Sequence, residues 1–175
     1  MVNNHPMTDS GTRPISSYIS LSDNYNITDF DGRFKVVAVI DEIVNQVKFK
    51  FRELTISIDD EYLSTIQTQI NNIYSNMRIG FLDDKLSVVL ISDDNTLHMY
   101  SSDDHGKTWL DIVILDILTP AGMEDKDTYM TTISIKDQML FVSITESLDK
   151  LVITDLNYHI VDSQLELTHK EVNEY

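Results

Sequence analysis

Apolar and polar residues alternate with a period of two along most of this chain, which is typical of strands that bury one face. Three runs, at residues 34–40, 86–91 and 139–145, are apolar almost throughout and have the length of strands. The complete pattern predicts strands at residues 15–21, 34–40, 46–51, 54–58, 78–82, 86–91, 96–101, 108–115, 129–135, 139–145, 151–154 and 159–167. Residues 22–33, rich in Asp and Asn, and residues 119–126, which contain Pro and Gly, are predicted to be loops.

The period changes once, near residues 60–77, where apolar residues are spaced alternately three and four positions apart. This spacing places them on one face of an amphipathic helix. The residues concerned are Leu63, Ile66, Ile70, Ile73 and Met77. Asp59 or Asp60 can cap such a helix, and Glu61 suits its first turn. We therefore predict one inserted helix whose apolar stripe packs against the core.

The strand pattern repeats with a period of roughly fifty residues, which is the scale of a β-propeller blade. Residues 34–40, 85–91 and 137–143 fall in register, and an alternating strand follows each of them. We expect a mainly β fold of about three antiparallel, four-stranded, propeller-like blades, with the helix inserted between the first two. Known propellers close with about four to eight blades. Two chains could therefore complete one ring, or the sheets could form an open stack or an antiparallel sandwich.

The segment at residues 102–109 joins two predicted strands and contains the only Trp of the chain. Its Asp side chains can accept hydrogen bonds from nearby backbone N–H groups, and its Gly can adopt a positive φ. The segment matches S-x-D-x-G-x-T-W at all five fixed positions, which are Ser102, Asp104, Gly106, Thr108 and Trp109. This pattern resembles the Asp-box, or BNR repeat, of sialidases and other β-propellers. The resemblance implies a structural turn between the third and fourth strands of a blade, away from any active site.

The length of 175 residues suggests one domain. We place a single β-rich domain at residues 15–167, after an extended polar arm at residues 1–14 and before an acidic tail at residues 168–175. The formal net charge of −16 repels phosphate backbones, so no direct nucleic-acid binding is expected. The chain has no Cys, no apolar run near the ~18 residues of a membrane helix, and no signal-peptide pattern. We expect synthesis in the cytoplasm and no membrane association.

The Asp-box resemblance brings sialidase chemistry into consideration, which in that family uses three arginines, a Tyr nucleophile with a Glu, and an Asp. The spacing of the four arginines marks no such triad: Arg13, Arg33, Arg52 and Arg78. Adjacent acids stand where predicted strands end, and Asp favours turns there. The five His residues form no helical zinc pair, and the chain has no phosphate-binding Gly-rich loop or nucleophile elbow. We expect no enzyme activity, no bound metal and no cofactor.

Contact with other molecules is then the expected function. We interpret the chain as a non-catalytic structural or assembly protein that binds protein partners or copies of itself, in the manner of a component of a viral or phage particle. One alternative is a carbohydrate-binding, propeller-like module. Its candidate ligand-facing aromatic residues are Tyr100 and Tyr129, while Trp109 is expected to be buried. A second alternative is an acidic inhibitor that mimics nucleic acid.

Overall fold

The computed structural model describes residues 18–21, 25–45, 48–123, 129–147 and 149–175. Within these ranges the protein is mainly β, as predicted, and its strands pair in two antiparallel sheets. The helical content of the described residues is a single four-residue helix. The predicted arm at residues 1–14 lies outside the described residues.

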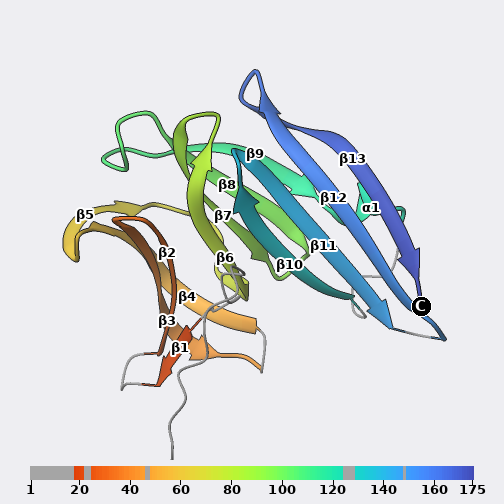
Figure 1. Ribbon diagram of the computed structural model, residues 1–175. Helices are drawn as coiled ribbons and strands as arrows, with labels where there is room; N and C mark the ends of the chain where they lie inside the picture. The colour runs from red at the N-terminus through yellow and green to blue at the C-terminus, as the bar shows by residue number, and fades with distance from the viewer. Residues whose placement is uncertain (1–17, 22–24, 46–47, 124–128, 148) are drawn as a thin grey trace, which may run out of the picture.

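The strands after β1 form three consecutive four-stranded meanders, which Figure 1 shows as three neighbouring groups. β1 (Tyr18–Leu21) pairs with the first strand of the first meander. The first meander consists of β2 (Tyr25–Asp31), β3 (Phe34–Ile43), β4 (Lys48–Ile58) and β5 (Glu61–Ile66). The second consists of β6 (Asn72–Leu82), β7 (Lys85–Ser92), β8 (Thr96–Ser102) and β9 (Leu110–Asp116), followed by helix α1 (Leu118–Ala121). The third consists of β10 (Tyr129–Lys136), β11 (Met139–Ser147), β12 (Leu151–Val161) and β13 (Gln164–Glu174).

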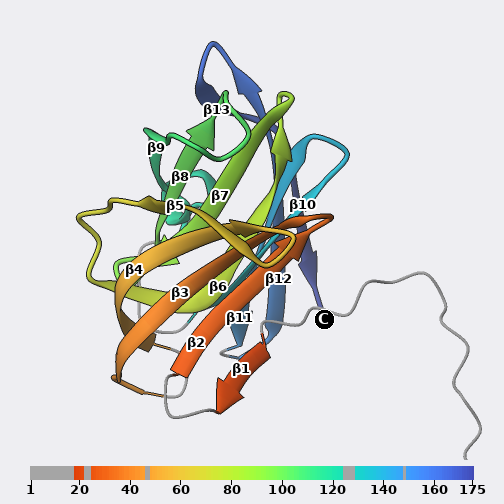
Figure 2. The same ribbon diagram turned by 90° about the vertical axis from the view of Figure 1, so that its left-hand side faces the viewer.

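Hydrogen bonds join the first two meanders into one nine-stranded sheet. The long strand β4 makes this connection because residues 54–58 pair with β5, whereas residues 48–50 pair with the start of β6. The third meander is a separate four-stranded sheet, and neither sheet closes into a barrel. β6 contacts both β2 and β10, so the three meanders meet at their first strands. Figure 2 shows β2, β6 and β10 in the same central region from a second direction.

Two-residue turns set the register of several hairpins. In the turns Asp59-Asp60, Asp83-Asp84, Asp137-Gln138 and Asp162-Ser163 both residues have positive φ, as a type I′ turn requires. At Asp59-Asp60, for example, the φ angles are 51° and 65°. Asp and Asn tolerate this left-handed conformation better than most residues. The adjacent acids at these hairpins are therefore turn residues, which agrees with the interpretation of the sequence.

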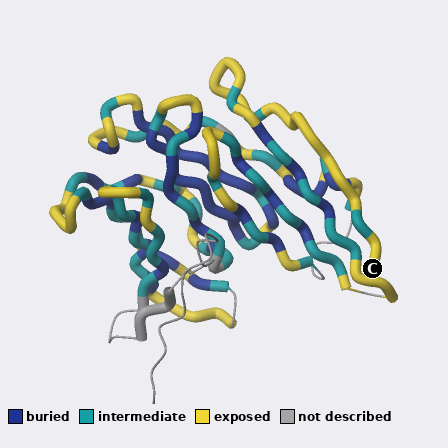
Figure 3. The backbone as a smooth tube through the Cα atoms, viewed as in Figure 1, coloured by how far each residue is buried: buried dark blue, intermediate teal, exposed yellow. Residues whose placement is uncertain are grey.

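The two hydrophobic cores lie on opposite faces of the middle meander. In β7, Leu86, Val88 and Leu90 belong to the first core, whereas Val89 and Ile91 belong to the second. The strand is buried on both faces, as the dark blue tube in Figure 3 shows, and this explains why its sequence is apolar rather than alternating. The middle meander is the central layer of the molecule, with the first and third meanders packed against its two faces.

The helix predicted at residues 60–77 is wrong, since this segment contains β5, a short connection and the first part of β6. Asp59 and Asp60 form a type I′ turn instead of a helix cap. The three-and-four spacing arises because the chain changes strand after Ile66, and because the pairing of β6 shifts register between Ile73 and Met77. β-Branched residues favour strands, and β4 and β7 supply the partners that the local pattern could not reveal.

Other predicted boundaries also differ from the structure. Residues 25–31, predicted to be loop, form β2, which gains its hydrogen bonds from β3. The strand predicted at residues 159–167 is divided by the Asp162-Ser163 turn. The predicted acidic tail at residues 168–175 continues β13 as far as Glu174. The predicted loop at residues 119–126 includes the last three residues of α1.

Candidate functional site

The loop at residues 102–109 connects the third and fourth strands of the middle meander. Ser102 Oγ donates to Asp104 Oδ1 at 2.8 Å and accepts the backbone N–H of Gly106 at 2.7 Å. The Asp104 carboxylate accepts the backbone N–H of Thr108 at 2.9 Å and its hydroxyl at 2.8 Å. These hydrogen bonds hold the pKa of Asp104 far below its usual range, and the bond from the backbone N–H of Thr108 has the largest effect. The carboxylate thus stays ionised and closes the loop.

Trp109 fastens this loop to the first meander. Its Nε1–H donates to Gly106 O at 3.1 Å and to Ser64 Oγ at 3.0 Å, and Ser64 donates to the same carbonyl at 2.5 Å. Gly106 has a φ of 88°, and a Cβ there would lie 3.1 Å from side-chain carbons of both Leu63 and Leu86. The residues at the fixed positions of the motif therefore make their contacts within the loop and with β5.

The aromatic residues predicted to face a ligand lie in other surroundings. Tyr100 is 2% exposed in the first core, and its hydroxyl is 2.6 Å from Thr68 Oγ1. Burial raises the pKa of the Tyr100 hydroxyl. The expectation that Tyr100 faces a ligand is wrong, because its side chain lies on the face of β8 that packs into the first core, where a ligand cannot reach it. Tyr129 is half-buried against the second core at the start of β10.

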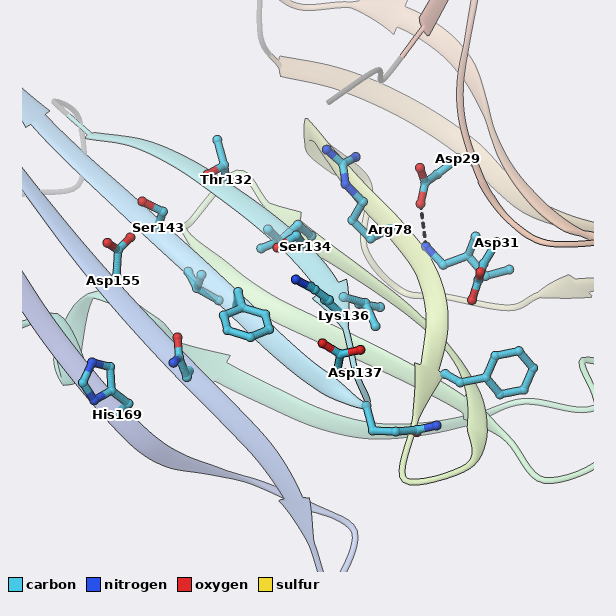
Figure 4. Close-up of a pocket in the computed structure, with 18 of the residues that line it drawn as sticks. Asp29, Asp31, Arg78, Thr132, Ser134, Lys136, Asp137, Ser143, Asp155 and His169 are labelled. Atoms are coloured by element: carbon cyan, nitrogen blue, oxygen red, sulfur yellow. Dashed lines mark hydrogen bonds between the residues drawn. The ribbon is translucent and has the colours of Figure 1, made fainter. Parts of the chain in front are cut away.

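A large open groove lies along the face of the third meander that is turned away from the second core (Figure 4). It encloses about 1430 Å³. β10, β11, β12 and β13 form one wall, while β2 and β6 contribute residues on the other side. None of the five fixed positions of the S-x-D-x-G-x-T-W pattern lines this groove, and neither do Tyr100 and Tyr129. The groove is the candidate site because it is a large concave surface in which polar side chains from several strands come together.

Strand pairing arranges the wall of the groove into rows of side chains that cross the four strands. The two central rows are Thr132, Ser143, Asp155 and Glu171, and next to them Ser134, Phe141, Asn157 and His169. These rows are polar apart from one half-buried aromatic ring. Lys136 and Asp137 lie at the end of β10, and Figure 4 shows their side chains at the lower part of the groove. The wall can offer hydrogen-bond donors and acceptors, negative charge and one apolar contact.

Asp29 links the first strands of the first two meanders at the groove. Its Oδ2 accepts the backbone N–H of Ile79 at 2.8 Å, the bond drawn in Figure 4. Burial raises the pKa of Asp29, and this effect exceeds the opposite effects of that hydrogen bond and of the Arg78 guanidinium. Arg78 Nη1 donates to Met77 O at 2.8 Å. Asp29 therefore binds β2 to β6 across the junction of the two meanders.

Among the described residues, no three His, Cys, Asp or Glu side chains are placed so that they could hold a metal ion. Arg33 pairs with Asp59, and Arg52 lies 3.8 Å from Asp41, on exposed surface in both cases. Arg78 is therefore the one described arginine in the groove. The three converging arginines of sialidases are absent from the part of the chain that the structure covers.

One Ser–His pair has the spacing of a nucleophile and its base. His98 Nε2 lies 3.0 Å from Ser92 Oγ, but Ser92 donates its proton to Asp94 Oδ1 at 2.5 Å or to Thr96 O at 3.1 Å. Both side chains of the pair are buried, and burial lowers the pKa of His98. The three-residue connection between β7 and β8 ends at Asn95, whose φ is 61°. The pair is thus buried and takes part in the hydrogen bonds of this turn.

Comparisons of the chain with protein-family models, with curated proteins and with solved structures find no match. Among the described helices, none has the length and apolar character needed to cross a membrane. The groove residues were not singled out from the sequence. Their signal is the alternation at residues 132–136, 143–147 and 155–159, where every second residue is polar, but such a pattern is also that of an ordinary solvent-facing strand.

Proposed function

We propose that this protein is a non-catalytic structural or assembly protein that acts by binding other proteins, as a component of a viral or phage particle does. The observation that carries the proposal is the groove of about 1430 Å³ on an uncovered face of the third meander. Small-molecule sites usually enclose about 300–1,000 Å³. The groove is larger and open, so its dimensions suit a segment of a partner chain.

The side chains of the groove support a polar contact with a protein. Interfaces between partners that also exist separately are about as polar as ordinary surface, and aromatic residues often anchor them. Phe141 would be the anchor, since it is half-buried at the centre of the wall. Asp155 and Glu171 are cross-strand neighbours in the row beside it. Their charges favour a partner segment that carries Lys or Arg.

The architecture gives a second support. We infer that the three meanders are propeller-like blades and that residues 102–109 form an Asp-box, because this loop joins the third and fourth strands of its meander. Each fixed side chain of the motif takes part in the loop's hydrogen bonds, and Gly106 supplies the positive φ. An open set of three blades leaves terminal faces and strand edges exposed, and such surfaces invite further chains.

Charge reversal in the groove tests the proposal. The tagged protein, purified from its native source, is expected to bring a partner that mass spectrometry identifies, and the partner is then produced separately for calorimetry. The double variant Asp155→Arg with Glu171→Arg should weaken binding of that purified partner by at least about tenfold, because each cross-interface charge pair contributes a kcal/mol or more when desolvated.

A matched control keeps the change of net charge the same but moves it away from the groove. Glu61→Arg with Asp149→Arg reverses two exposed acids outside the groove lining and should leave the affinity within about twofold of the wild type. A protein that is monomeric and without a partner in its native source would contradict the proposal. Equal losses of affinity in both double variants would also contradict it, since the groove would then have no special role.

One observation favours carbohydrate binding as a second candidate function. Phe141 stands in the wall with Asn157 directly across the strand pair and Asp155 in the adjacent row, and planar polar side chains around an aromatic ring suit a sugar. A glycan array probed with the wild type and with Phe141→Ala separates the two proposals. Binding of a defined glycan that Phe141→Ala abolishes would support the second candidate, whereas an array without signal would remove it.

A further inference from the structure

Strand pairing fixes which end of β1 meets the groove. β1 is antiparallel to β2, and its first residue, Tyr18, pairs with Thr28. β2 continues as far as Asp31, but among the described strands only β3 pairs with residues 29–31. Residues 29–32 line the groove. The chain that precedes Tyr18 therefore joins β1 at the groove, beside an edge of β2 that no described strand occupies.

The sequence before β1 continues the pattern of this strand. Apolar and polar residues alternate through residues 15–21, so the strand predicted from the sequence begins three residues before Tyr18. The register is set by the pairs that β1 makes with β2, and continuing it places Ile15 opposite Asp31. Pro14 has no N–H group and would end this pairing at the point where β2 itself ends. The direction and the register of any extension are thus fixed by the described strand.

The groove carries an excess of acids, whereas the segment before β1 is neutral. The described Lys and Arg residues of the lining are Arg78 and Lys136. The described acids of the lining are Asp29, Asp31, Asp137, Asp155 and Glu171. Residues 1–17 contain one acid, Asp9, and one basic residue, Arg13, in a chain whose formal net charge is −16. Charge repulsion therefore opposes this segment in the groove less than it opposes the chain as a whole.

We propose that the segment of residues 1–17 occupies the groove of its own chain. Residues 15–17 extend β1 along β2, and the residues before them lie against the wall formed by β10–β13. Residues 1–14 reach about 45 Å when extended, whereas four strands about 4.8 Å apart are crossed in less than about 20 Å, so the length is sufficient. The covalent link to β1 gives this segment an effective concentration in the millimolar range, which a separate chain does not have.

This occupant adds a form of regulation to the proposed function, and that part of the inference rests on the proposed function. A partner segment can bind only where the groove is open, so its apparent affinity falls as the fraction of occupied grooves rises. Arg13, the one basic residue of the segment, offers the acids of the wall the same charge that the proposed partner would offer. The segment thus acts as an internal competitor of the partner.

A pair of introduced cysteines tests the extension of β1, because the native chain contains none. Directly opposed residues of antiparallel strands have Cβ atoms about 4.5–5.5 Å apart, close to the separation in a disulfide. In the full chain, Ile15→Cys with Asp31→Cys should form an intramolecular disulfide upon mild oxidation. Ser16→Cys with Asp31→Cys is the matched control and should stay mainly reduced, because successive side chains point to opposite faces of a strand. No disulfide in the first pair, or equal yields in both, would overturn the proposed extension.

A paramagnetic label at Met7→Cys tests whether the rest of the segment lies in the groove. It should broaden the amide signals of Ser143 and Asn157, which line the wall, and leave those of β9 sharp, since no described residue of β9 lines the groove. Wall signals that stay as sharp as those of β9 would overturn the location. Neither this measurement nor the disulfide requires a partner, so both remain decisive if the proposed function fails.

The cross-linked chain also tests the regulation. The oxidised Ile15→Cys, Asp31→Cys protein should bind the partner at least about tenfold more weakly than its reduced form, because the disulfide keeps the segment beside the groove. Equal affinities of the two forms would refute the internal competitor. A disulfide that forms in a chain without a native partner would contradict the proposed function and would still support the extension of β1.

Discussion

Aspartate acts in this chain mainly through backbone conformation and hydrogen bonding in turns. Asp59, Asp60, Asp83 and Asp84 all have positive φ in two-residue turns. Asp104 instead uses its carboxylate to gather donors of its own loop. These roles explain why adjacent acids are so frequent where strands end, without any requirement for catalysis or metal binding.

Replacing Ser102 tests the loop at residues 102–109. In Ser102→Ala the buried N–H of Gly106 loses its acceptor, and Asp104 loses a donor. We expect a loss of about 1–2 kcal/mol in the free energy of unfolding, measured by urea denaturation followed by circular dichroism. Thr108→Ser retains the hydroxyl and should change stability by less than about 0.5 kcal/mol. Equal stability of Ser102→Ala and the wild type would contradict the structural role of the loop.

The buried carboxylate of Asp29 predicts a defined dependence of stability on pH. Its folded pKa is raised above the unfolded value, mainly by burial, so the folded state binds more protons. This group therefore lowers stability as pH rises from about 3.8 through the raised pKa. Asp29→Asn keeps an acceptor for Ile79 without the charge. The stability of the variant minus that of the wild type should therefore be larger at neutral pH than at acidic pH.

Asp59→Asn provides a control of opposite sign. Its hydrogen bonds with Arg33 lower the pKa of Asp59 in the folded state. The carboxylate therefore stabilises the fold at pH values above its unfolded-state pKa, and this stabilisation is lost as the pH falls through the folded-state pKa. Asp59→Asn should thus lose stability at neutral pH and match the wild type in acid. Unfolding curves collected at several pH values measure both variants. A difference between Asp29→Asn and the wild type that does not vary with pH would refute the interpretation of Asp29.

At the scale of elements, close packing of β6 on β10 holds the third meander against the others. Gly80 of β6 is buried, and a Cβ at this position would lie 2.9 Å from Cγ2 of Ile135. Contacts this short do not occur without displacement of the neighbour. Glycine at this position thus lets the two first strands approach each other, and this approach places β10 beside the groove.

Gly80→Ala should therefore destabilise the protein by about 1–3 kcal/mol through overpacking. In the double variant Gly80→Ala with Ile135→Ala, the closest atom, Cγ2 of Ile135, is removed. The double variant should therefore lose less stability than the sum of the losses in the two single variants. Thermal or urea unfolding of the wild type, both single variants and the double variant provides the cycle. Strict additivity would show that the two side chains do not meet as described.

At the scale of the whole molecule, we expect the two cores to unfold as one cooperative unit, because both pack on the middle meander. Val88 and Val89 are adjacent in β7 but belong to different cores, and both are fully buried. Damage to either core should thus be transmitted through the strand that they share. Trp109 packs against the first core, so its fluorescence reports on that side of the molecule.

Val89→Ala tests this cooperativity. Removal of two buried carbons from the second core should lower the free energy of unfolding by about 2 kcal/mol. The Trp109 fluorescence transition should move together with the far-ultraviolet circular dichroism transition, although Trp109 belongs to the other core. Val37→Ala, at a partly exposed position on β3, should have a smaller effect. Separate transitions for the two signals would show that the cores unfold independently.

The sequence predicted the strands well where a local rule was sufficient. Residues 34–40 and 86–91 are strands because apolar runs of strand length need burial within a sheet. Adjacent Asp residues such as Asp83-Asp84 end strands because they tolerate positive φ. The same local rules failed at residues 60–77. There the periodicity of a helix was produced by two strands and a register shift, and only pairing with β4 and β7 distinguishes the two structures.

The sequence alone determined the mainly β class and most of its strands and turns, because these depend on side-chain burial and φ preferences that act over a few residues. The tertiary structure decided the partners: how β4 joins two meanders, why Tyr100 is buried, and which polar residues of β10–β13 share a groove. These properties depend on contacts between residues far apart in the chain. The backbone edges of all strands offer the same hydrogen-bonding groups, and their apolar faces have similar compositions. Which strands pair and which faces pack is therefore decided only when the layers come together.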